Sequence, residues 1–335
     1  MTHVGQGKRT ATHGTPAARV PTGMAGLPAV TKLRLAAKAA RSSLRRYPRH
    51  LWESFGPQSA ESSGADEGPL AQFGTGRVSA VWIGHATVLL SIEGTDGRHT
   101  TILTDPVFSD RIGLSVGQTT FGLRRLAQPA VDLAKLPPID LVLLSHAHFD
   151  HLDRPTLRRL AAGPGRNAAV ITASRTQRLV PSGFASVHEL PWDRSLQIGP
   201  LRIDAMRPAH WGARTAVDRR RGFNSYVITS GDRRVLFAGD TAATDAFERI
   251  GPMDLSVFGV GAYEPWEHAH ATPEQVWKMF RSLRGDNGKL LPMHHSTFDL
   301  GEERPGEPLK RLEAAAGADW HSVVCRGIGG SYDLT

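Results

Sequence analysis

One short segment of the sequence carries most of its potential chemistry. Three histidines and an aspartate, His146, His148, Asp150 and His151, stand within six residues, directly after the apolar run 139–144. Imidazole nitrogen and carboxylate oxygen are ligands that zinc and similar divalent metals prefer. A loop after a buried strand lets such groups converge, because neither helix nor sheet geometry holds them apart. The segment therefore predicts a metal site.

Three more potential ligands follow later apolar runs. His210 comes shortly after the run 201–206, Asp240 ends the run 235–240, and His294 follows the strand predicted over 289–292. Each alone is a weak signal, since a strand-end Asp is often a cap and a strand-end His is often structural. Their appearance in order after the dense motif favours one site with more than one metal ion.

Length and composition fit a soluble globular protein of one or two domains. The chain has 335 residues, of which 40% are hydrophobic and 21% are charged. Its only cysteine, Cys325, stands in an apolar run, so we expect a buried thiol rather than a nucleophile. We find neither a membrane-spanning apolar run nor the apolar core of a secretory signal, and we expect a cytoplasmic protein.

The net charge of +8 comes from the first 50 residues. They hold ten Lys and Arg side chains and no Asp or Glu, which leaves 30 basic and 32 acidic side chains for the rest. We expect a disordered basic tail over 1–28, a basic amphipathic helical segment over 29–55, a linker over 56–71 and one folded domain over 72–335. Residues 29–47 are a candidate for peripheral contact with an anionic membrane surface. The near-neutral folded part argues against a nucleic acid partner.

The folded part is rich in predicted strands, with helices between them. Strands are expected over 78–83, 87–92, 100–104, 139–144, 169–172, 201–205, 225–229, 234–237, 255–260 and 289–292, and helices over 155–162, 244–250, 272–284 and 307–316. Thr272, Pro273 and Gln275 form a capping box that marks the start of the third helix. Strands in both halves predict an α+β fold of two packed sheets with helices outside.

The order His-x-His-x-Asp-His, His, Gly-Asp-Thr and His resembles that of the metallo-β-lactamase fold superfamily. Within it, several segments resemble the family of the zinc-dependent phospholipase D that hydrolyses N-acylphosphatidylethanolamine. They are residues 81–87 (VWIGHAT), 103–109 (LTDPVFS), 136–140 (LPPID), 237–241 (FAGDT) and 261–265 (GAYEP). This resemblance implies an αββα four-layer sandwich with the metal site at one edge, between the sheets. It also implies two Zn²⁺ ions, with other divalent metals as alternatives: His146, His148 and His210 would bind one, Asp150, His151 and His294 the other, and Asp240 would bridge them.

A pair of such ions suits phosphodiester hydrolysis, because coordination lowers the pKa of water towards about 7 and the metals offset phosphate charge. The family has a functional histidine where His270 stands, and we expect it to stabilise the substrate phosphate or the leaving group. Asp240, Asp150 and His270 are the predicted catalytic residues. His85 and Asp105 are expected to orient ligating imidazoles.

The expected function is therefore that of a phospholipase D-type phosphodiesterase, acting on N-acylphosphatidylethanolamine-like or related glycerophosphodiester lipids. A sugar or acyl lactone hydrolase is the alternative, because related family members share the Trp-x-Gly-His-x-Thr signature. The non-enzymatic alternative is a membrane-associated metal-binding module. The chain departs from the animal enzyme over 294–298, where HHSTF replaces HWGTF, and it matches poorly over 112–125. Substrate identity thus transfers less well than metal chemistry, and the oligomeric state stays open.

Overall fold

The computed structural model describes residues 68–335, apart from 117–118, 216–217 and 219. The predictions for the tail 1–28, the helical segment 29–55 and most of the linker 56–71 lie outside the described residues. In the part that is described, no helix is both long and apolar enough to cross a membrane.

The first sheet has seven strands in the order β15-β1-β2-β3-β6-β7-β8. Strands β1 to β3 pair antiparallel, and β3, β6, β7 and β8 pair parallel. The bounds are β1 Val78–Gly84, β2 Thr87–Glu93, β3 His99–Thr104, β6 Leu141–Leu144, β7 Ala169–Thr172, β8 Ser186–Glu189 and β15 Ser331–Leu334.

The second sheet has six strands in the order β14-β13-β12-β11-β10-β9. Strands β9 to β12 pair antiparallel, whereas β12, β13 and β14 pair parallel. The bounds are β9 Ser195–Ile198, β10 Leu201–Met206, β11 Ser225–Ser230, β12 Arg233–Phe237, β13 Leu255–Gly259 and β14 Lys289–Met293.

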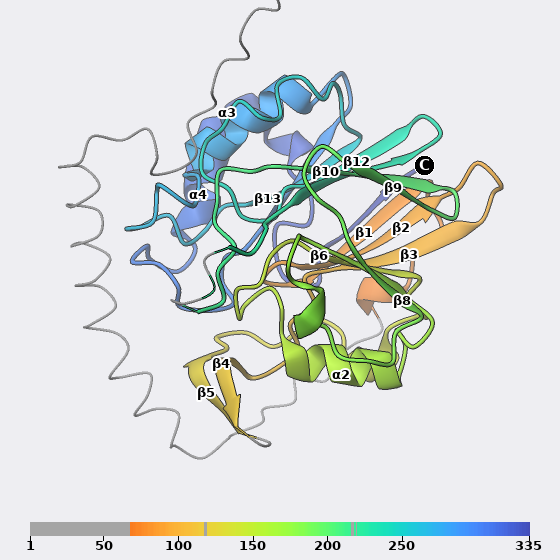
Figure 1. The fold of residues 1–335 in the computed structure, drawn as a ribbon. Helices are drawn as coiled ribbons and strands as arrows, with labels where there is room; N and C mark the ends of the chain where they lie inside the picture. The colour runs from red at the N-terminus through yellow and green to blue at the C-terminus, as the bar shows by residue number, and fades with distance from the viewer. Residues whose placement is uncertain (1–67, 117–118, 216–217, 219) are drawn as a thin grey trace, which may run out of the picture.

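The two sheets pack face to face, and helices cover both outer faces (Figure 1). Alternate residues of a strand point to opposite faces, so Leu143 joins the core between the sheets while Val142 joins the core beneath a helix. That helix, α2 (Arg154–Ala162), covers the first sheet. Helices α3 (Pro273–Leu283) and α4 (Glu307–Ala316) cover the second. The predicted αββα sandwich is confirmed.

Helix α3 begins where its capping box predicts. The Thr272 hydroxyl accepts a hydrogen bond from the Gln275 backbone N–H at 3.4 Å, and the Gln275 side chain accepts one from the Thr272 N–H at 2.9 Å. Helix α4 has the predicted bounds and α2 starts one residue earlier than expected. Cys325 is buried, as expected, and burial raises the pKa of its thiol to about 12.

The helix expected over 244–250 is wrong. The segment is a series of turns, closed by i→i+3 hydrogen bonds from the N–H of Glu248 to Asp245 O (3.0 Å) and from the N–H of Ile250 to Phe247 O (3.2 Å). Gly251 follows at φ 78° and ends any helical continuation. Phe247 is buried in the core, but the apolar face of this segment is too short for its burial to offset the cost of helix nucleation.

A hairpin not predicted from the sequence lies at the rim of the molecule. Among the described strands, β4 (Arg111–Val116) and β5 (Thr119–Arg124) pair only with each other. Gly113 lies opposite Gly122 with φ 148°, and a Cβ atom there would stand 2.0 Å from the Phe121 carbonyl oxygen. Arg125, directly after the hairpin, forms an isolated antiparallel β-bridge with Phe298. Phe298 lies four residues beyond the predicted ligand His294.

Candidate metal centre

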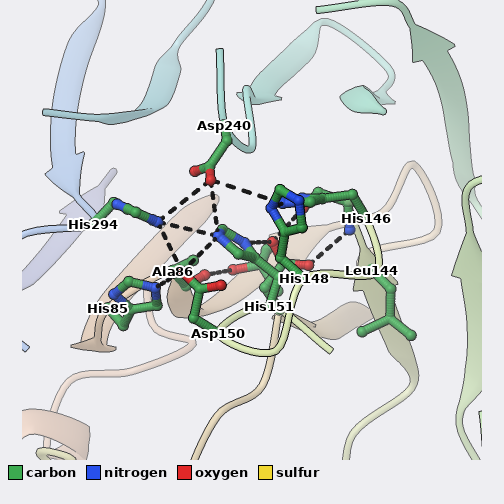
Figure 2. A network of polar contacts seen from close by, with 12 residues as sticks. His85, Ala86, Leu144, His146, His148, Asp150, His151, Asp240 and His294 are labelled. Carbon is green, nitrogen blue, oxygen red and sulfur yellow. Dashed lines mark hydrogen bonds and ion pairs between the residues drawn. The ribbon is translucent and has the colours of Figure 1, made fainter. Parts of the chain in front are cut away.

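Strand direction explains why distant residues meet at one edge. In the first sheet, β1, β3 and β6 run the same way, and they end just before His85, Asp105 and the His146 motif. In the second sheet, β10, β12 and β14 run the same way and end shortly before His210, Asp240 and His294. Figure 2 shows His85, the His146 motif, Asp240 and His294 directed toward one another. Contacts with His151 and Asp240 place Asp105 and His210 in the same cluster.

The first donor group consists of His146, His148, His210 and Asp240, whose nearest ligand atoms lie within 4.8 Å of one another. The His148 Nδ1 atom is 2.7 Å from His146 Nε2 and 3.4 Å from His210 Nε2. Two imidazoles come from the motif after β6, and the third comes from the other sheet. Three nitrogen donors and one oxygen donor thus point at a common centre.

The second donor group consists of His85, Asp150, His151 and His294, again within 4.8 Å of one another. The Asp150 Oδ2 atom is 3.3 Å from His294 Nε2 and 3.5 Å from His151 Nε2. The two imidazole Nε2 atoms, of His151 and His294, are 3.1 Å apart. Three of these residues were predicted to bind the second metal, and His85 joins them.

Asp240 stands between the two groups. Its Oδ2 atom lies 3.7 Å from His210 Nε2 and 3.8 Å from His146 Nε2 in the first group. The same atom lies 3.0 Å from His151 Nε2 and 3.4 Å from His294 Nε2 in the second. Its Oδ1 atom is buried without a hydrogen-bond partner. This is the arrangement expected of a carboxylate shared by two metal ions.

A carboxylate beneath the site connects with both groups. Asp105 Oδ2 lies 2.7 Å from His151 Nδ1, and it also accepts a hydrogen bond from the Ser145 hydroxyl at 2.5 Å. That hydroxyl is in turn 2.8 Å from His146 Nδ1. Asp105 therefore contacts an imidazole, as predicted. Ser145 was missed, although its place between β6 and His146 could have indicated it.

Two other contacts differ from expectation or were not foreseen. His85 Nε2 lies 3.0 Å from the Asp150 carboxylate and the His85 ring packs on that of His294, so His85 contacts a carboxylate in addition to a proposed ligating imidazole. The guanidinium of Arg214 donates to the carbonyl oxygens of Ala147 (2.9 Å) and Leu152 (2.8 Å) and thereby holds both ends of the motif loop. No sequence signal links Arg214 to that loop.

His270 faces the centre from the loop before α3. Its Nδ1 atom is 3.9 Å from Asp240 Oδ2, and its ring centroid lies 5.2 Å from that of His210 and 5.3 Å from that of His294. The His270 side chain is 16% exposed, whereas those of His210 and His294 are 1% exposed. His270 is thus a polar group near the donors that a substrate can reach.

The protonation states suit metal binding. Burial lowers the pKa of His148 to about 3 and that of His210 to about 4, so these imidazoles are neutral and have a free lone pair. Burial disfavours the charged form of Asp240, but His151 and His294 outweigh it and hold the carboxylate pKa well below its usual range. Burial likewise opposes a charged His151, yet Asp240, Asp150 and Asp105 raise its pKa well above the ordinary value.

The charges and unpaired atoms of the cluster call for a bound cation. Buried carboxylates surround His151 and favour positive charge there, while neutral imidazoles offer lone pairs and Asp240 Oδ1 has no hydrogen-bond partner among the described residues. Buried charge and unpaired polar atoms are costly unless a cation or partner compensates them. The His/Asp cluster therefore fits a divalent metal site.

Comparisons with known proteins agree with this geometry. A family model described as a beta-lactamase superfamily domain matches residues 100–295. An uncharacterized protein of Mycobacterium tuberculosis is 33% identical over 276 residues, which cover 77% of this chain and 69% of that protein. An N-acyl-phosphatidylethanolamine-hydrolyzing phospholipase D of Caenorhabditis elegans is 29% identical over 256 residues, which cover 70% of this chain and 69% of the relative.

A solved structure shows the same fold in a different context. CmlA, a diiron beta-hydroxylase from Streptomyces venezuelae, matches with a TM-score of 0.51 and 19% sequence identity, over 74% of this chain and 52% of that protein. This likeness extends to the fold, while the neighbour's iron and its reaction are properties of that protein.

Proposed function

The chain belongs to the β-lactamase superfamily, and we propose that it is a dinuclear, zinc-dependent phosphodiesterase of phospholipase D type. The observation that carries the proposal is the position of the Asp240 carboxylate, with donors of both groups within 4 Å of one oxygen atom. The substrate class rests on the likeness to the nematode phospholipase D, and N-acylphosphatidylethanolamine or a related glycerophosphodiester is the proposed substrate.

The donor groups divide the proposed ligands between two ions. The first ion would be held by His146, His148 and His210, the second by Asp150, His151 and His294, and both by Asp240. Bound zinc supplies a nucleophile from water near neutral pH and offsets the negative charge of a phosphodiester. Zinc is proposed from the imidazole-rich donor set, and iron or manganese would suit the same ligands.

The protein's own groups orient the reaction. Asp240 keeps the two donor groups in register, and Asp150, whose side chain is 13% exposed, closes the second group on the side that solvent reaches. His270 stands opposite with its Nδ1 atom 3.9 Å from Asp240 and is proposed to hold the phosphate or give a proton to the leaving oxygen. Solvent access favours catalysis over a purely structural site, because structural sites are usually closed.

The proposal is tested on purified protein whose metal content is measured by elemental analysis. We expect two metal ions per chain, release of phosphatidic acid from N-acylphosphatidylethanolamine vesicles, and hydrolysis of a soluble aryl phosphodiester. His148→Ala should lose both activities. His295→Gln is the control, since His295 packs on Trp82 and contacts none of the proposed ligands by hydrogen bond. If the protein with both metals bound hydrolyses lactones but no phosphodiester, the phosphodiesterase proposal is wrong and the lactonase alternative is correct.

We further propose a cytoplasmic protein that reaches lipid through residues 29–47, which carry the basic amphipathic pattern. Deleting 1–47 should weaken binding to anionic vesicles while hydrolysis of the soluble phosphodiester continues. Equal vesicle binding by the full-length and shortened proteins would contradict the peripheral membrane contact without affecting the proposed chemistry.

A further inference from the structure

His85 is a buried imidazole beside the proposed ligands that has no role in the function above. Its Nε2 atom lies 3.0 Å from Asp150 Oδ2, and its side chain is 1% exposed (Figure 2). The ring also packs on that of His294, with the centroids 4.1 Å apart. His85 therefore contacts all three other members of the second donor group, Asp150, His294 and, edge to face at a centroid distance of 5.5 Å, His151.

The backbone holds His85 in a fixed position. His85 has a φ of 53°, and its N–H donates to the Thr297 hydroxyl at 2.8 Å. Its carbonyl oxygen accepts from the Trp82 indole N–H at 2.8 Å and from the His294 backbone N–H at 3.0 Å. The imidazole is thus anchored to the loop that carries a proposed ligand, and its direction is set by the end of β1.

The surroundings of the two ring nitrogens show which atom is the donor in the hydrogen bond between His85 and Asp150. The other ring nitrogen of His85, Nδ1, is buried and has no hydrogen-bond partner in the described part of the chain. A neutral imidazole has one N–H. If Nδ1 carried it, a buried donor would be unpaired and the Nε2 lone pair would face a carboxylate, which is the costlier arrangement. The Nε2–H group therefore donates to Asp150 Oδ2, and Nε2 is not free to bind a metal.

We propose that His85 is a positioning residue for the second metal, because it holds Asp150 Oδ2 towards His151 and His294. This inference rests on the proposed dinuclear site. No described residue is a counterpart of His85 in the first half, where the Ser145 hydroxyl and the Ala269 carbonyl oxygen contact imidazoles at 2.8 and 3.0 Å. Loss of the His85 contact should release the second metal selectively, by the roughly 10–100-fold loss of affinity typical of such partners.

Two amide substitutions test this inference. In His85→Gln the amide nitrogen can occupy the Nε2 position and still donate to Asp150, whereas in His85→Asn it reaches only the Nδ1 position. Asn also suits the left-handed backbone at this residue, which limits effects on folding. Zinc is titrated into the metal-free proteins in competition with a chromophoric chelator, and cobalt spectra report each site. Circular dichroism and thermal melting check the fold.

We expect His85→Asn to weaken one of two sites about 10–100-fold and His85→Gln to retain most of the affinity. Equal affinity of His85→Asn and wild type, equal weakening of both sites, or a His85→Gln protein as weak as His85→Asn would each overturn the positioning role. A wild-type protein that binds a single zinc ion would overturn the dinuclear function as well, and that result is read before any variant is made.

Discussion

The two donor groups meet at Asp240 but differ in composition and support. The first takes its other three donors from imidazoles, whereas the second includes a further carboxylate, Asp150, and a buried imidazole, His85, that contacts this carboxylate. Oxygen-rich sites attract harder ions, and nitrogen-rich sites favour zinc and its neighbours. If the two proposed ions are bound, the two halves should therefore differ in metal selectivity, and the second half, with its additional carboxylate, should depend more on the charge of its ion.

Asp240→Asn should have the largest effect, because it alters both halves together. We expect metal content to fall below two ions per chain and kcat/KM to fall by more than about 100-fold, beyond the range for residues outside the ligand set. Elemental analysis and the soluble phosphodiester assay measure both quantities. Full retention of two ions by this variant would mean that the halves do not share the carboxylate.

His148→Ala and His294→Ala form a matched pair, with one imidazole removed from each half. Each should weaken one metal site by more than about 10-fold and leave the other titratable, since the remaining donors of the other half are intact. Zinc titration and cobalt spectra of the two variants should differ. Identical cobalt spectra and identical metal stoichiometry in the two variants would show that the halves bind metal as one cooperative unit. The distinction between a first and a second half would then be wrong.

His270→Gln should separate turnover from metal binding. His270 faces both halves but is more exposed than the proposed ligands, so the variant should keep its metal content while kcat falls about 10²- to 10⁴-fold. Steady-state kinetics with metal analysis on the same sample checks this. Loss of metal in parallel with activity would instead make His270 a ligand.

Glu274→Gln should have the smallest effect, because Glu274 belongs to neither donor group and pairs with Arg311 at the start of α3. A hydrogen bond from Arg311 lowers the pKa of Glu274 to about 2, with side-chain contacts of 2.8 and 2.9 Å. At pH 7 the substitution should cost about 0.2–1 kcal/mol of unfolding free energy, because the pair is solvent-exposed. A carboxyl group whose pKa is lower in the folded than in the unfolded protein stabilises the folded state at pH values above its unfolded pKa. The difference in unfolding free energy between wild type and Glu274→Gln should therefore shrink as the pH falls below about 4.

Urea unfolding of wild type and Glu274→Gln at several pH values measures that difference. Metal content should be unchanged, which makes this variant a control for the four variants above. A stability difference that grows towards low pH would contradict the assigned ion pair.

The sequence predicted the layers and the residues that meet in the His/Asp cluster, because both depend on local order. Each predicted ligand follows an apolar run that became a buried strand, and strand ends of one direction meet at one edge. The hairpin at 111–124 was missed because its strands pair only with each other, so they add no apolar run to the core. The contact of His85 with Asp150 joins residues 65 positions apart, and no local pattern encodes it.

The strand-end geometry has a mechanical consequence. The first sheet contributes His146 and His151 and the second contributes His210, Asp240 and His294, so the cluster spans the seam where the sheets meet. Sliding one sheet against the other by even an ångström would change several donor distances simultaneously. The packed core between the sheets therefore limits how far the donor atoms of the cluster can move. A large-to-small substitution in that core, distant from the cluster, should weaken metal binding under conditions in which the protein is still folded.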